Sequence, residues 1–143
     1  MTPSPSFKRT HLRRSSQLKR YTFPERQIYV AKKFHSRSDQ IRDIVPGLGA
    51  CYASDHITVE GRKVGFMYRE APDNDTDSGW RFLSGAERQE YLDDPKHLGI
   101  YDVNTIANYD EGIVALLSAA VGSAYRRTAS DEFVAEDMSD DDA

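Results

Sequence analysis

A stretch near the middle of the chain, in which large side chains alternate with small or polar ones, places the strongest constraint on the fold. Val64, Phe66 and Tyr68 occupy every second position, and a period of two puts them on one face of a β-strand. Trp80, the single tryptophan, and Phe82 share a face in the same way. We therefore expect the large side chains of two strands to meet in one core layer.

Turn residues divide the rest of the chain into short elements. Short strands are expected at 50–53, 57–60, 63–70, 80–83, 100–101 and 123–127. The second and third of these strands would form a hairpin around Gly61. Short helices are expected at 86–92, 103–107 and 111–117. Asp102 and Asp110 would cap the last two helices, because an N-cap carboxylate accepts bonds from unpaired backbone N–H groups.

These elements predict an α+β fold class, in a single small domain with a curled antiparallel sheet and short inserted helices. In the N-terminal part, one helix is expected at about 23–34 and another after Ser38, ending at Pro46. Composition then divides the chain into four parts. They are a disordered basic tail (1–20), a helical N-terminal extension (21–48), the α+β domain (49–130) and a disordered acidic tail (131–143).

The net charge of −4 conceals an uneven distribution along the chain. Residues 1–42 hold eleven Lys or Arg and two acids, residues 43–130 hold eight and fourteen, and residues 131–143 hold seven acids and no basic residue. The basic head is either a solvated extension or a segment that contacts nucleic acid phosphates. The second reading uses the basic side chains of Lys8, Arg9, Arg13, Arg14, Lys19 and Arg20.

Cysteine content and hydropathy predict a cytoplasmic protein. Cys51 is the single cysteine, so an intramolecular disulfide is impossible and a reducing compartment is expected. The longest apolar run, Ile113–Leu117, is far shorter than the eighteen or so residues that span a bilayer, so no membrane contact is expected.

No residue pattern in the chain predicts catalysis, a cofactor or a metal site. The carboxylates of Asp73, Asp75 and Asp77 alternate as in a calcium loop, but Ser78 and Ser84 occupy the positions of the required glycine and glutamate. A solvated turn explains this segment better. Cys51 lies between small and aromatic residues of an expected strand, as buried cysteines do. The sequence thus predicts a protein that is not an enzyme.

Two groups of residues leave alternatives open. Trp80 is either a core residue of the sheet or an exposed anchor for a partner, and the strand alternation favours the core. Asn104, Asn108 and Tyr109 either stabilise a tight turn or present a hydrogen-bonding surface, because amides and phenols can do both.

Three segments together resemble the immunity-protein-33-like family of small bacterial domains, namely VGFMYREAPDNDTDSGWRFLSG, IYDVNTIANYD and GSAYRR. The resemblance covers about residues 49–127. It implies an α+β fold and an inhibitor that neutralises a protein toxin. The matching positions are 68–70, 77–80, 101–102 and 104–110.

The predicted function is a non-enzymatic protein-binding module, an immunity-type protein that occludes a toxin. A body with a net charge of about −6 would attract a cationic toxin at long range. The alternative is a nucleic-acid-associated regulatory protein that binds through its basic N-terminal segment. The candidate partner-binding residues are Tyr68, Arg69, Glu70, Asp73, Asp75, Asp77, Trp80, Asn104, Asn108, Tyr109 and Asp110.

Overall fold

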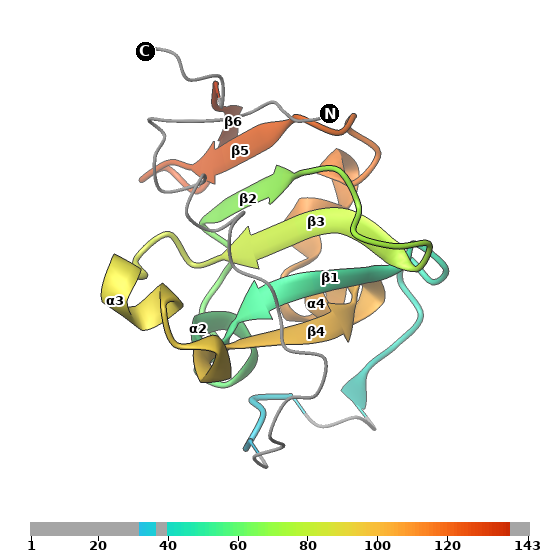
Figure 1. Cartoon of the computed structure of the whole chain (residues 1–143). Coiled ribbons are helices and arrows are strands. Elements are labelled where there is room, and N and C mark those ends of the chain that lie inside the picture. Colours follow the sequence, from blue (N-terminus) through green and yellow to red (C-terminus); the bar gives the residue numbers. More distant parts are fainter. Residues whose placement is uncertain (1–31, 37–39, 138–143) are drawn as a thin grey trace.

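One six-stranded sheet organises the computed structural model, which describes residues 32–36 and 40–137 (Figure 1). The strand order is β4-β1-β3-β2-β5-β6. The strands are β1 (Ala50–Ser54), β2 (Phe66–Arg69), β3 (Asp77–Leu83), β4 (Leu98–Asp102), β5 (Ala124–Arg127) and β6 (Phe133–Ala135). The predicted α+β class is confirmed, but the sheet is mixed, because β1 pairs in parallel with β3 and the other pairs are antiparallel.

Short helices connect the strands. They are α2 (Asp55–Thr58), α3 (Gln89–Leu92), the 3-10 helix η2 (Pro95–His97), α4 (Val103–Tyr109) and the 3-10 helix η3 (Glu111–Leu116). The predicted caps of the last two are confirmed: Asp102 accepts from the N–H of Asn104, and Asp110 from that of Gly112. Helix α4 lies behind the sheet in the view of Figure 1. There its apolar side chains pack against the sheet and form part of the main hydrophobic core.

The sheet is apolar on both faces, and the strand register decides which side chains share a face. Met67 pairs with Phe82, and Phe66 with Leu83. Phe82 and Trp80 therefore belong to the main core with α4 and η3, whereas Phe66 lies in a second cluster on the other face. The expectation that Trp80 and Phe82 join Phe66 and Tyr68 in one layer is wrong. An apolar pattern on both faces leaves the register undetermined.

Residues 57–60, expected to form a strand, instead follow β1 as helix α2 and a turn. The Ser54 side chain caps this helix by accepting a hydrogen bond from the His56 N–H at 3.2 Å. Ile57 and Thr58 are completely buried, so tertiary packing overrides the strand preference of β-branched residues. The predicted hairpin with 63–70 is therefore wrong.

The expected helix at 23–34 lies mostly outside the described residues, and 32–34 are not helical. The segment 41–49 consists of loop and turns, so a helix continuing from Ser38 to Pro46 is also wrong. At the other end, β6 falls within the range assigned to the acidic tail. Its pairing with β5 and the contact of Phe133 with the main core extend the sheet beyond residue 130.

Candidate functional site

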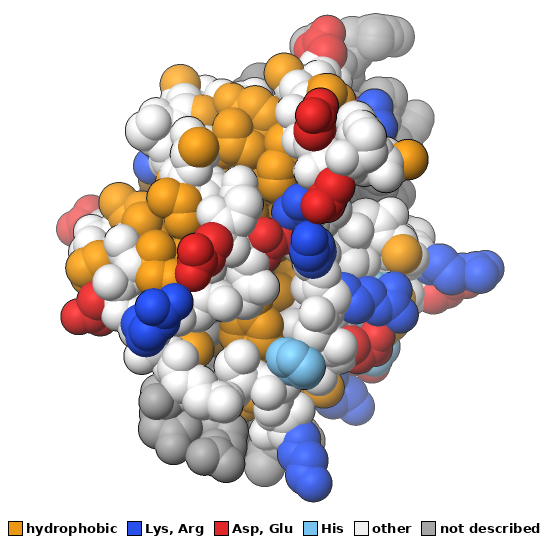
Figure 2. Space-filling model, turned by 180° about the vertical axis from the view of Figure 1, so that it is seen from behind, with side chains coloured by type: hydrophobic (Ala, Val, Ile, Leu, Met, Phe, Trp, Pro, Cys, Tyr) orange, Lys and Arg blue, Asp and Glu red, His pale blue; other side chains and the backbone are white. Residues whose placement is uncertain are grey.

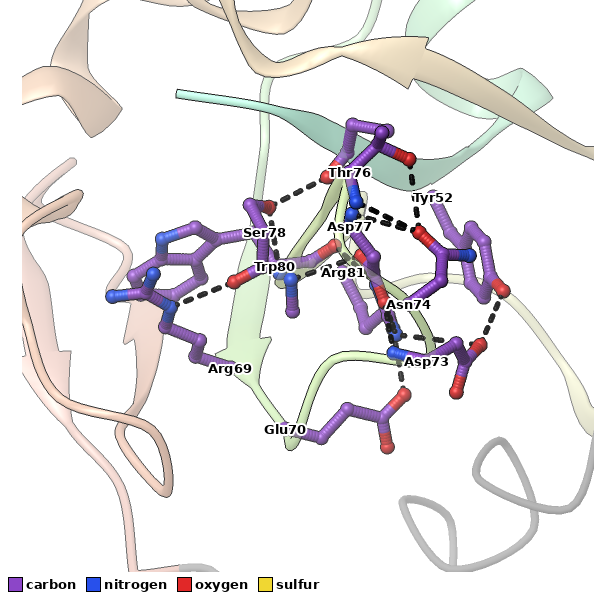
Figure 3. Close-up of polar contacts among 12 residues, drawn as sticks. Tyr52, Arg69, Glu70, Asp73, Asn74, Thr76, Asp77, Ser78, Trp80 and Arg81 are labelled. Atoms are coloured by element: carbon purple, nitrogen blue, oxygen red, sulfur yellow. Dashed lines mark hydrogen bonds and ion pairs between the residues drawn. The ribbon is translucent and has the colours of Figure 1, made fainter. Parts of the chain in front are cut away.

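The loop 71–76, which joins β2 to β3, is exposed along its whole length at one end of the sheet (Figure 1). It presents the carboxylates of Asp73 and Asp75 to solvent. We call it the acidic loop. The residues around its base come from β1, β2 and β3, and Figure 3 shows how they converge.

Hydrogen bonds within the acidic loop hold its shape. Asn74 Oδ1 accepts from the Thr76 N–H, the Thr76 hydroxyl and the Asp77 N–H at 2.9–3.0 Å. Asp77 Oδ2 accepts from the Asp73 N–H at 2.8 Å, and Asp77 Oδ1 accepts from the Gly79 N–H at 2.9 Å. Side chains that bond to backbone two to four residues away are typical of ordered turns. The loop is therefore preorganised.

Arg81 on β3 is only 3 % exposed, and its side chain stabilises the base of the acidic loop. Its guanidinium binds both carboxylate oxygens of Asp77 at 2.9 Å, and its Nε donates to Glu70 Oε2 at 2.6 Å. The Tyr52 ring packs on the guanidinium with 4.0 Å from the ring centroid to Cζ. The Tyr52 hydroxyl donates to Asp73 Oδ2 at 2.7 Å. Bidentate and stacked contacts of this kind need arginine, because lysine has no planar fork.

The charges in this cluster stabilise one another. Burial alone would raise the pKa of Asp77, but its hydrogen bonds with Arg81 and the positive charge of Arg81 outweigh burial and hold that pKa below 3.8. Burial would lower the pKa of Arg81, yet Asp77 and Glu70 raise it. Burial and the bond to Asp73 raise the pKa of the Tyr52 hydroxyl. Asp77 and Arg81 therefore stay ionised at neutral pH, and the Tyr52 hydroxyl keeps its proton.

The end of the sheet that carries the acidic loop differs in charge from the opposite end. The three loops at this end, residues 43–49, 70–76 and 117–123, contain no Lys or Arg. Loops 59–65 and 84–97 at the opposite end carry basic residues as well as acids. In the view from behind, most Lys and Arg side chains lie on the side away from the acidic loop (Figure 2). The acidic loop thus lies in a negative part of the surface.

Several predicted site residues are structural instead. Trp80 is 1 % exposed and its indole Nε1 donates to the Leu117 carbonyl at 3.2 Å, so it is a core residue and not an exposed anchor. Tyr68 is buried in the second cluster. Asp110 is buried, forms an ion pair with Arg127 at 2.5 Å and accepts from the Val64 N–H at 3.0 Å.

The amides of α4 anchor the preceding loop. Asn104 Oδ1 accepts from the N–H groups of Ile44 and Val45 at 2.7 and 2.8 Å, and Asn108 Oδ1 accepts from the Arg42 N–H at 2.9 Å. The Tyr109 hydroxyl donates to the Thr58 carbonyl at 3.0 Å. These side chains form hydrogen bonds with backbone groups of other segments, so they stabilise local structure, as the first of the two interpretations expects.

Arg69 also binds backbone. Its Nε donates to the Ser78 carbonyl at 2.9 Å and its Nη1 to the Ala119 carbonyl at 2.7 Å. Four of the predicted partner-binding residues lie together in the structure. Asp73 and Asp75 belong to the acidic loop, and Glu70 and Asp77 flank it and bind Arg81. Arg69 and Trp80 lie beside this group, where Arg69 binds the Ser78 carbonyl (Figure 3), and the remaining predicted residues lie elsewhere in the fold.

Sequence reasoning missed Arg81 and Tyr52 at this site. It also missed a second polar cluster, in which His56 Nδ1 lies 2.7 Å from Ser84 Oγ and 3.5 Å from Glu87 Oε2. A catalytic triad needs its serine and its carboxylate on opposite ring nitrogens, whereas both face Nδ1 here. Glu87 also binds the N–H groups of Ser84 and Gly85 at 2.8 and 3.0 Å, as a turn-capping residue does.

Other reactive groups and cation sites are also accounted for within the described ranges. Cys51 is completely buried, and burial raises the pKa of its thiol, which disfavours the reactive thiolate. Residues 32–36 and 40–137 contain no group of three or more His, Cys, Asp or Glu placed to hold a metal ion. Lys8, Arg9, Arg13, Arg14, Lys19 and Arg20, the predicted nucleic-acid contacts, lie outside the described residues.

A scan against protein families matches residues 51–137 to the immunity protein Imm33 domain, a range that includes the acidic loop and all of the strands from β2 to β6. The chain belongs to the Imm33 family. This match confirms the resemblance seen in the sequence and indicates an immunity-type role. Comparisons with curated proteins and with solved structures found no match. Among the described residues of this Imm33 protein, no helix has the length and apolar character needed to cross a bilayer.

Proposed function

We propose that this Imm33 protein neutralises a protein toxin in the cytoplasm by binding it through the acidic loop, without catalysing a reaction. The proposal rests on an exposed loop that presents two carboxylates, Asp73 and Asp75. The buried Arg81 stabilises the base of this loop through its ion pair with Asp77. The family supports a protein toxin as the kind of partner.

Preorganisation favours tight binding. A flexible loop loses conformational entropy when it binds, and that loss offsets part of the interaction energy. In the acidic loop, the Asn74 and Asp77 hydrogen bonds have already ordered the backbone. The Asp73 carboxylate is further oriented by the Tyr52 hydroxyl. A partner can therefore contact the loop without first reshaping it.

The negative charge around the acidic loop favours a toxin with a cationic surface. The loops around the site contain carboxylates and no Lys or Arg, so their field would attract a basic surface during approach. Many toxins that cleave nucleic acids need a basic surface to bind the phosphates, and occupying that surface blocks their substrate. Occlusion of this kind needs no chemistry from the inhibitor.

The test uses the full-length protein and the product of the gene next to its own, expressed as the candidate toxin. Co-expression should protect cells from that toxin, and the purified proteins should form a complex. Asp73→Asn/Asp75→Asn should slow association by about 10-fold at low salt, because the steering charges are lost. Glu90→Gln/Glu132→Gln is the matched control, because it removes the same charge from exposed positions outside the loop. Equal slowing by the two double variants would contradict a role for the acidic loop.

A further inference from the structure

Two further loops lie beside the acidic loop at the same end of the sheet. They are residues 43–49, which lead into β1, and residues 117–123, which lead into β5. In the strand order, β3 and β2, which the acidic loop joins, lie between β1 and β5. The Ala50 N–H donates to the Thr76 carbonyl at 2.8 Å, and the Gly122 N–H donates to the Arg69 carbonyl at 2.7 Å. Backbone hydrogen bonds therefore fix one loop on each side of the acidic loop.

Each of these two loops exposes one large apolar side chain. Leu48 is 44 % exposed, and Val121 is 52 % exposed. Each lies next to a glycine with a positive φ, namely Gly47 at 85° and Gly122 at 102°. An added Cβ at either glycine would meet nothing within 4 Å, so glycine is needed there for the backbone conformation and not for close packing. The glycines thus permit tight turns at the two positions where the apolar side chains reach solvent.

Apolar and acidic side chains therefore share one surface, which we call the three-loop surface and which consists of residues 43–49, 71–76 and 117–123. Among the described residues, five large hydrophobic side chains are exposed, and two of the five belong to this surface. Figure 2 shows hydrophobic side chains next to acidic ones on the side of the acidic loop. Protein interfaces combine apolar contacts with a polar rim, and the three-loop surface offers both kinds of side chain.

We propose, on the basis of the toxin binding proposed above, that the toxin contacts all three loops and that Leu48 and Val121 bind apolar side chains lying among its basic residues. The occupant of the three-loop surface is then a protein surface that is both basic and apolar. A second copy of this chain does not fit in the same place. Two such surfaces would bring the carboxylates of Asp73 and Asp75 together, and the three loops contain no Lys or Arg to compensate.

The two kinds of side chain act on different steps of binding. Exposed charges act at long range and mainly change the association rate, whereas contacts formed in the finished complex mainly change the dissociation rate. Leu48 and Val121 lose their exposed apolar area only in the finished complex. A basic protein without matching apolar side chains would therefore associate rapidly and dissociate rapidly, so Leu48 and Val121 contribute to the choice of toxin.

Binding kinetics of the full-length protein with the candidate toxin test this division. Leu48→Ala/Val121→Ala should raise the dissociation rate by about 10-fold or more and should change the association rate by less than about 2-fold. Ile100→Ala/Val134→Ala is the matched control, because it removes the same number of carbon atoms from positions on β4 and β6 that are 55 % and 40 % exposed. The control should keep both wild-type rates.

The free protein gives a second measurement. Because Leu48 and Val121 are exposed, Leu48→Ala/Val121→Ala should have a urea midpoint at least as high as that of Ile100→Ala/Val134→Ala. A lower midpoint would show that another segment of the chain already covers these side chains. A wild-type dimer in sedimentation velocity that Leu48→Ala/Val121→Ala abolishes would assign the surface to a second copy. Either result would overturn the proposal.

The kinetic results also separate the three-loop surface from the proposed function. A complex that dissociates at the same rate in the two double variants would overturn the apolar contacts and leave toxin binding by the acidic loop intact. Absence of any complex would overturn both, because the toxin would then not be the partner. Faster dissociation in Leu48→Ala/Val121→Ala alone is the result that supports the proposal.

Discussion

At the scale of single residues, Arg81 joins two strands and a loop. It binds Asp77 and Glu70 while buried, and it supports the Tyr52 ring on its flat face. Nothing in the sequence distinguishes this arginine from the six other arginines in the described part of the chain, all of which are exposed or partly exposed, because its role depends on the strand register. Asp73 and Asp75, in contrast, could be placed in an exposed turn from the surrounding Pro, Asn and Gly residues.

We predict that Arg81→Met lowers the free energy of unfolding by about 3–5 kcal/mol, because it leaves the buried carboxylates of Asp77 and Glu70 without their counter-ion. Urea denaturation of the full-length protein measures this change. Arg88→Met, at a largely exposed position, should change the free energy by less than about 0.5 kcal/mol. A similar decrease in the free energy of unfolding in both variants would contradict the stabilising role of Arg81.

The pKa of Asp77 predicts a pH dependence. Its folded-state pKa lies below 3.8, so its contribution to stability is complete above the unfolded value and is lost as the pH falls below 3.8 through the folded value. Asp77→Asn should therefore be less stable than the wild type at pH 7, and the difference should shrink as the protein is acidified below pH 4. A difference independent of pH would show that the Asp77 charge is not what stabilises the loop.

At the scale of elements, the helices whose caps are contacts between sequence neighbours could be predicted, whereas contacts between distant segments could not. The helices after Asp102 and Asp110 could be located because each cap is a contact between neighbours in the sequence. Helix α2 was mistaken for a strand, since Ile57 and Thr58 owe their conformation to burial. The parallel pairing of β1 with β3 joins segments far apart in the chain and has no local signal.

Helix α4 holds the loop before β1, and Asn104 is the main contact. We predict that Asn104→Ala lowers the free energy of unfolding by about 1–3 kcal/mol, because the partly buried N–H groups of Ile44 and Val45 lose their acceptor. Hydrogen exchange at these two amides should accelerate more than exchange in β3. Thr105→Ala, one position along the same helix, is the control. Unchanged exchange at Ile44 and Val45 would contradict this role of Asn104.

At the scale of the whole molecule, the two ends of the sheet differ in charge. The acidic loop and its neighbours form a negative end, and the opposite end has mixed charge. The sequence predicted the fold class and the family, both of which are confirmed, and it indicated the acidic loop as a contact region. It did not predict that most of the other proposed contact residues are internal, because that depends on how the two faces of the sheet are covered.

The most direct test of the account measures association of the full-length protein with the product of the neighbouring gene, the candidate toxin, as a function of salt. We predict rapid association that slows as salt rises, and a weaker salt dependence for Asp73→Asn/Asp75→Asn, because two steering charges are removed. Glu90→Gln/Glu132→Gln should keep the wild-type dependence. Absence of a complex at low salt would contradict the proposed immunity function. Wild-type kinetics in the loop variant would show that the toxin contacts a different surface.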